Sequence, residues 1–224
     1  MTSRNDNRAP SGTIHRSIHL LAAALEDLGA QAPLPEVERI AIMINEAMTA
    51  GGRSFHTPEH VFALVDAGNP HTTLAALFHD LVYYQVDEGF TPQIAEAVQA
   101  SLEARDGQLS LRAGDERDRG LAICRGVFGF RADQVLSPFG GMNEFLSALV
   151  MHRRLSGLLR ERDLVPATAC IEATIPFRKP DAAGRTPAEF LEERLRAASD
   201  ELGLALSRCR TSGPATHRGS RTGR

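Results

Sequence analysis

The 224-residue chain has no tryptophan, only 5% aromatic residues and only three cysteines. Cys124, Cys170 and Cys209 are odd in number and far apart, which argues against a disulfide framework and against a clustered-cysteine zinc site. A chain of this kind is expected in a reducing cytoplasm. Its core has to be built mainly from leucine, alanine, valine and isoleucine.

Long apolar runs and a strong excess of one charge are also missing. No apolar run reaches the roughly 18 residues that a membrane span requires, so no membrane association is expected. The polar stretch 1–12 lacks the apolar segment of a signal peptide. The net charge is -3, so the overall basic character of a nucleic-acid-binding protein is absent and a nucleic-acid partner is not expected.

The chain does contain apolar residues at helical spacing, without convincing two-residue alternation. This pattern predicts an all-α domain over residues 13–206, between a disordered leader at 1–12 and a disordered arginine-rich tail at 207–224. Several helix starts are marked by Thr-Pro, in which threonine caps the helix and proline takes its first position. The expected helices are 18–28, 35–50, 58–67, 72–84, 92–104, 121–127, 142–159, 166–175 and 187–206, with a loop at 105–110.

The most informative residues are His79 and Asp80, which lie inside the apolar run 74–83. A histidine and an aspartate are costly to bury unless a partner compensates them. A divalent metal is such a partner, because imidazole and carboxylate groups are both metal ligands. A second histidine cluster, His56 and His60, precedes this run and could meet it in space.

Helix geometry allows a common site. Two helices packed 8–10 Å apart can place His60, His79 and Asp80 around one point. Three protein ligands leave coordination positions open for water, as a catalytic metal needs. For each histidine taken alone, the simpler interpretation is a hydrogen-bonded residue of the core.

His60 followed by His79-Asp80 and a distant acidic residue resembles the H…HD…D signature of the HD-domain superfamily of metal-dependent phosphohydrolases. The resemblance covers about residues 50–86 and is nearer to a bacterial subgroup with a Tyr-His pair and an FHD-I-V-Y segment. It implies an HD-domain-like helical bundle in which His60, His79 and Asp80 bind the metal. It also implies that His56 donates a proton to the leaving group.

A fourth ligand and a phosphate-binding residue would complete such a site. The family has an aspartate as fourth ligand, and the corresponding segment 168–176 has only Glu172 as an acidic residue. Arg53 could bind a phosphate through its planar fork, although a solvated arginine fits as well. The remaining acidic candidates are Asp133 and Glu144 as fourth ligand, and Asp87 and Glu88 for a water or a second metal.

These residues predict hydrolysis of a phosphate ester or phosphoanhydride in a small phosphorylated substrate, with a nucleotide favoured by analogy only. The metal is left open among Mn, Fe, Co, Ni, Zn and Mg. The main alternative is a non-catalytic HD-fold regulatory or binding protein with a vestigial metal site. A third hypothesis is a di-iron, oxygen-activating relative. The sequence leaves the oligomeric state undetermined.

Overall fold

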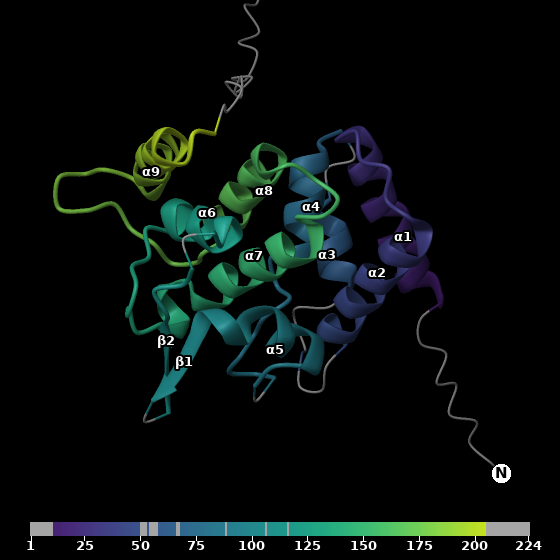
Figure 1. The fold of residues 1–224 in the computed structure, drawn as a ribbon, viewed down its shortest axis with the longest axis horizontal. Coiled ribbons are helices and arrows are strands. Elements are labelled where there is room, and N and C mark those ends of the chain that lie inside the picture. The colour runs from purple at the N-terminus through teal and green to yellow at the C-terminus, as the bar shows by residue number, and fades with distance from the viewer. Residues whose placement is uncertain are drawn as a thin grey trace, which may run out of the picture.

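The computed structural model of the chain describes residues 11–49, 53, 58–65, 68–87, 89–105, 107–115 and 117–204. This part of the chain is mainly helical, as predicted (Figure 1). The predicted tail, most of the predicted leader and His56 lie outside the described residues. The helices are α1 (Ser11–Asp27), α2 (Leu34–Met48), α3 (Pro58–Leu64), α4 (Pro70–Phe78), α5 (Pro92–Val98), α6 (Arg119–Phe128), α7 (Met142–Leu155), α8 (Glu161–Ala173) and α9 (Pro187–Leu202).

Helix α4 is the centre of the bundle. Asn69 caps its N-terminus by accepting hydrogen bonds from the backbone amides of His71 and Thr72, and Pro70 takes the first helical position. All six residues from Thr73 to Phe78 are buried, as expected for a helix surrounded by others. It packs against α1 and α3 on one side and against α7 and α8 on the other (Figure 1).

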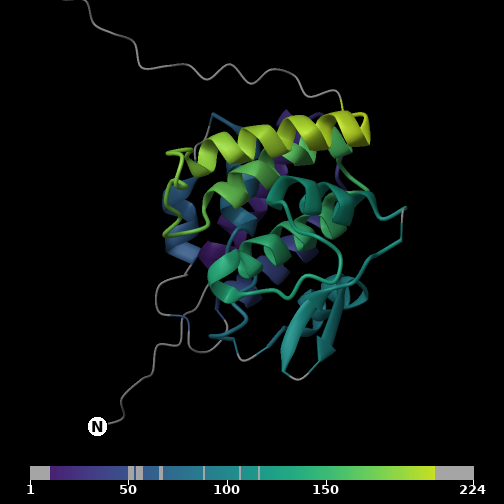
Figure 2. The same cartoon turned by 90° about the vertical axis from the view of Figure 1, so that its left-hand side faces the viewer.

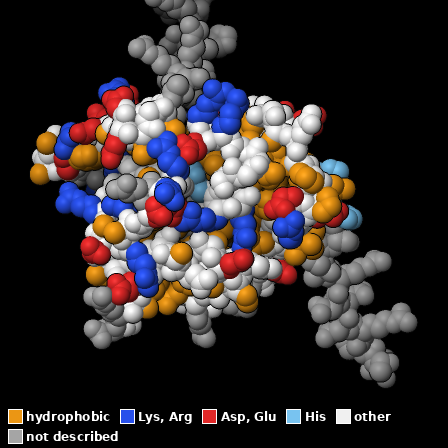
Figure 3. Space-filling view, viewed as in Figure 1, with side chains coloured by type: hydrophobic (Ala, Val, Ile, Leu, Met, Phe, Trp, Pro, Cys, Tyr) orange, Lys and Arg blue, Asp and Glu red, His pale blue; other side chains and the backbone are white. Residues whose placement is uncertain are grey.

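One hydrophobic cluster joins the helices, with buried residues from Leu21 in α1 to Leu204 after α9. Helix α9 lies across α6 and α8 (Figure 2). Acidic and basic side chains are interspersed on the face shown in Figure 3, in keeping with the small net charge. None of the described helices combines the length and apolar character needed to cross a bilayer.

A β-hairpin corrects part of the helix prediction. Strands β1 (Leu102–Arg105) and β2 (Gln108–Leu111) pair antiparallel, where the sequence predicted the end of a helix and a loop. Arg105 pairs with Gln108, which leaves Asp-Gly at 106–107 between the strands. Asp-Gly is a strong two-residue hairpin signal, because glycine adopts the positive φ that the turn needs, and Gly107 has φ 75°. The strands are only four residues long, so their alternation was easy to miss.

Two helix starts also differ from the prediction. Helix α8 begins at Glu161, whereas the sequence predicted a start at Pro166. Pro166 lies inside α8 and removes one of its helical hydrogen bonds, while the acidic first turn with Glu161 and Asp163 stabilises the positive helix end. Helix α1 begins at Ser11, inside the segment that was predicted to be a disordered leader.

The end of α4 is the difference that matters for the site. The apolar pattern predicted a helix through residue 84, but α4 ends at Phe78, and His79 and Asp80 form the turn that follows. Side chains from distant segments bind the backbone of this turn: the hydroxyl of Ser147 accepts a hydrogen bond from the Val82 amide, 3.0 Å away. The chain can therefore leave the helix without burying unpaired backbone groups.

Candidate metal centre

His60, His79 and Asp80 come together at the edge of the core. Their candidate ligand atoms all lie within 4.8 Å of one another, and the centroids of the two imidazole rings are 5.9 Å apart. His60 comes from the first turn of α3, and the other two residues come from the turn that follows α4. His79 is buried, Asp80 is partly buried and His60 is exposed, so the cluster opens to solvent on the His60 side.

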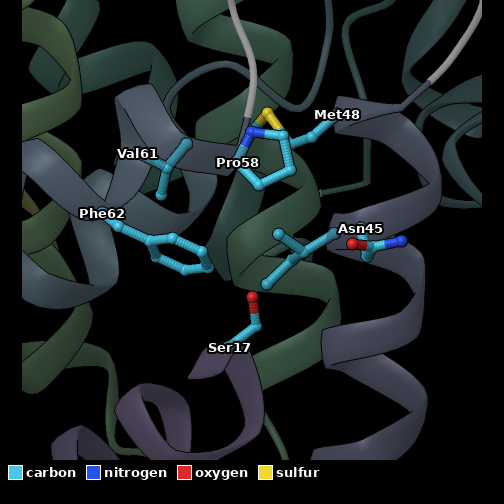
Figure 4. Close-up of a pocket in the computed structure, with 7 residues that line it drawn as sticks. Ser17, Asn45, Met48, Pro58, Val61 and Phe62 are labelled. Carbon is cyan, nitrogen blue, oxygen red and sulfur yellow. The ribbon is translucent and has the colours of Figure 1, made fainter. Parts of the chain in front are cut away.

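Helix α3 is held in place by its buried face. Val61 and Phe62 pack into a narrow crevice against Ser17 of α1 and Met48 of α2 (Figure 4). The crevice has no room for a water molecule, so the contact is close. The guanidinium of Arg16 covers the Phe62 ring at 4.4 Å from its centroid. This packing holds His60, one residue before Val61, opposite the end of α4.

The hydrogen bonds of His79 define the state of its ring. Nδ1 lies 2.9 Å from the carbonyl oxygen of Ala76, which can only accept, so Nδ1 carries a proton. Nε2 lies 2.8 Å from Oδ2 of Asp80. In a neutral imidazole this places two lone pairs face to face. The contact is favourable only when a second proton or a cation lies between the two atoms.

Electrostatics agree with this geometry. Burial disfavours protonation of His79, but the hydrogen bond and charge of Asp80 outweigh it, so the pKa of His79 is raised. The fold thus attracts positive charge to a position where burial alone would exclude it.

Arg53 has a different place from the one expected. Its side chain is fully buried, and all three of its guanidinium nitrogens already donate hydrogen bonds, to Asp87 and to the backbone carbonyls of Asp80 and Leu81. A phosphate-binding role for Arg53 does not fit this placement, because the guanidinium has no free edge directed at a substrate. Asp87, expected to serve a water or a second metal, is the partner of this arginine.

Glu144 is the acidic residue that does approach the cluster. It lies three residues before Ser147 on α7, so both are on the helix face that contacts the segment after Asp80. Burial and then the charge of Asp80 raise the pKa of Glu144, and its charge also interacts with His79 and Arg178. Its Oε2 is buried and has no hydrogen-bond partner among the described residues.

The other acidic candidates lie elsewhere. Glu172 is 1% exposed and forms ion pairs with Arg178 and Arg194, and it is not part of the group formed by the two histidines and Asp80. The simpler expectation for a glutamate in an apolar helix, a buried salt bridge, describes what is seen. Asp133 is exposed in a turn next to the hairpin, and Glu88 lies outside the described residues.

Two polar residues of α7 that hold the turn carry no signal in the sequence. Asn143 accepts a hydrogen bond from the Tyr84 amide at 3.2 Å, as Ser147 does from Val82. Both look like ordinary helix residues in the sequence, and only the packing of α7 on this turn gives them a role.

No known family, curated protein or solved structure matches this chain. A functional interpretation therefore depends on the geometry of the site.

Proposed function

We propose that the chain is a metal-dependent phosphohydrolase of the HD-domain type, with its metal held by His60, His79 and Asp80. The contact between Nε2 of His79 and Oδ2 of Asp80 carries this proposal. Nδ1 is committed to a carbonyl, so Nε2 is left to bind a cation. Two ligands bound at roughly 2.1 Å and at a right angle on one ion would be about 3 Å apart, close to the 2.8 Å observed.

Two further observations fit a divalent ion. Imidazole and carboxylate ligands suit Mn, Fe, Co, Ni or Zn, and Mg less well. The unpaired carboxylate oxygen of Glu144 supplies additional negative charge beside the cluster, and none of the described protein groups uses it. A divalent ion held here would activate a water for attack on phosphorus and neutralise charge on a phosphoryl oxygen.

The open side of the cluster gives a small phosphorylated molecule a route to it. His60 is exposed whereas His79 is buried, so a substrate would approach over α3. A nucleotide is the favoured class through the HD-domain resemblance alone. The assignment of His56 as proton donor stays a prediction, since this residue lies outside the described part of the chain.

A second candidate function is a regulatory or binding protein with a vestigial metal site. One observation favours it: the carboxylate expected as the fourth ligand, Glu172, is neutralised by Arg178 and Arg194. Such a protein would bind the metal and not turn over substrate.

Titration of the metal-free protein with Mn²⁺, beside a screen of p-nitrophenyl phosphate and nucleotides, tests both candidates. His15 and His19 are exposed four residues apart on α1, a spacing that can itself bind metal, so both are replaced by alanine in every variant. The proposal expects about one bound ion, lost in Asp80→Ala, together with phosphate release. Binding without turnover of any substrate favours the second candidate. Absence of binding contradicts both.

A further inference from the structure

Arg53 and Asp87 form a buried ion pair beside the candidate metal centre. Their side chains are 0% and 8% exposed, respectively. Nε of Arg53 donates to Oδ1 of Asp87 at 2.8 Å, and Nη2 donates to Oδ2, so the pairing is bidentate. A buried pair of this kind is costly to desolvate and is weak support for stability alone. The other hydrogen bonds of Arg53 indicate that the pair has a role besides stability.

The remaining donors of Arg53 hold the backbone of the site. Nη1 donates to the carbonyl oxygen of Asp80 at 2.6 Å, and Nη2 donates to that of Leu81 at 3.1 Å. Both carbonyls follow the last turn of α4, where the helical hydrogen-bond ladder has ended. Asp87 in turn fixes the plane of the guanidinium. One rigid group therefore determines where the backbone of Asp80 lies.

We infer that the Arg53–Asp87 pair is a positioning device that aims the carboxylate of Asp80 at His60 and His79. The inference rests on the proposed metal centre. Asp80 has left the helix, so helical geometry no longer fixes its direction, and a carboxylate displaced by about 1 Å would bind the ion poorly. Groups that orient metal ligands without touching the ion commonly contribute about 10–100-fold to metal affinity.

The substitution Arg53→Lys distinguishes the effect of the positive charge at residue 53 from the effect of its positioning of the backbone. Its ammonium keeps the charge but is a compact donor that cannot reproduce the planar fork between a carboxylate and two carbonyls. The chain also offers a matched control. Arg153 forms a similar bidentate ion pair with Asp118 and also donates to Ser101, but it contacts neither carbonyl of the site.

The experiment compares Arg53→Lys with Arg153→Lys in the full-length chain. Mn²⁺ affinity is measured at a temperature where both are folded, and hydrogen exchange of residues 79–84 is followed in the metal-free protein. Arg53→Lys is expected to lower Mn²⁺ affinity about 10–100-fold and to speed exchange of this segment. Arg153→Lys is expected to change affinity by less than about twofold.

Wild-type affinity and exchange in Arg53→Lys would overturn the inference, as would an equal loss of affinity in Arg153→Lys. If Arg53→Lys does not fold, Asp87→Asn keeps the arginine and the volume while loosening its anchor, and the same outcomes apply. Failure of the proposed function looks different. In that case His79→Ala binds Mn²⁺ like the wild type, and the exchange measurement alone decides whether Arg53 holds the turn.

Discussion

The surroundings of His79 and His152 contrast two kinds of buried polar group in one core. Nε2 of His152 lies 2.8 Å from the hydroxyl of Thr168, which donates to the carbonyl of Leu164 at 2.9 Å. Because the Thr168 hydroxyl donates its proton to the Leu164 carbonyl, its oxygen accepts the hydrogen bond from Nε2 of His152. At His79 one ring nitrogen is matched in the same way, but the other faces a carboxylate lone pair. The chain of donors and acceptors from Nε2 of His152 to the Leu164 carbonyl is complete, whereas the contact between His79 and Asp80 needs a proton or a cation between its two atoms, which is where a ligand can bind.

Three buried or partly buried carboxylates repeat this contrast. Asp118 and Glu172 are each neutralised by arginine, and Asp118 also caps α6 by accepting from the Leu121 amide. Glu144 has a buried oxygen without a hydrogen-bond partner among the described residues, next to the His79 cluster. Glu144 lies in the first turn of α7, on the part of this helix that contacts the segment after α4.

The largest expected effect on metal binding comes from removing the contact between His79 and Asp80. Asp80→Ala deletes a predicted ligand and should lower Mn²⁺ affinity by at least about 100-fold, or roughly 2.7 kcal/mol. Calorimetric titration of metal-free protein measures it. The matched control His152→Gln, in the completed chain, should bind Mn²⁺ normally. Equal Mn²⁺ affinities for Asp80→Ala and wild type would show that the surroundings of His79 are no more a metal site than those of His152.

Glu172→Gln tests the other side of the comparison. It leaves two arginines beside a neutral amide in a buried position, and breaking a buried ion pair costs about 3 kcal/mol. Since Arg178 and Arg194 are about a quarter exposed, we expect about 2 kcal/mol less unfolding free energy in urea and unchanged Mn²⁺ affinity. Loss of metal binding would restore Glu172 as the fourth ligand.

Acid should destabilise the protein through the completed chain at His152. Burial, together with the charge of Arg153, lowers the pKa of His152 to about 4. The unfolded state takes up a proton near pH 6.5 while the folded state does not, so this contribution is complete above that pH. It is lost as the pH falls from 6.5 towards 4, on the order of 3 kcal/mol in total.

The difference between wild type and His152→Gln isolates this effect in urea unfolding at several pH values. The wild type should lose more stability than the variant between pH 6.5 and 4. Parallel curves would show that His152 becomes protonated in the folded protein as easily as in water.

The sequence predicted the helical class from local apolar periodicity, and it predicted the clustering of His60, His79 and Asp80 from their spacing and the resemblance to the HD-domain signature. Apolar periodicity is strong across α2, α6 and α7, and the His-Asp pair is conspicuous in an apolar run. The hairpin was missed although its Asp-Gly turn was visible, since two four-residue strands carry little periodicity. The HD-domain assignment and the metal stay predictions.

What the sequence could not provide is the partners of each charged group. Arg53 and Asp87 are 34 residues apart, and nothing local distinguishes a buried arginine from one that binds substrate. In the same way, the end of α4 depends on Ser147, which is 65 residues from Val82. Long-range packing decides which carboxylates are neutralised and which are left for a ligand.

The smallest expected effect is at Glu144, where function and stability should change in opposite directions. Glu144→Gln removes negative charge beside the cluster and should lower Mn²⁺ affinity about tenfold, or roughly 1.4 kcal/mol. The same change should raise the stability of the metal-free protein at neutral pH. Burial and Asp80 raise the pKa of Glu144, so its charged form opposes folding there.

Urea unfolding and Mn²⁺ titration of the same metal-free samples measure the two quantities. Glu144→Asp, which keeps the charge on a shorter side chain, should retain more affinity than Glu144→Gln. A stabilised Glu144→Gln variant with wild-type affinity would mean that the partly buried carboxylate only destabilises the fold. A variant that loses both affinity and stability would mean that Glu144 is a structural residue. Glu144 would then belong with Asp118 and Glu172, and not with the cluster around His79.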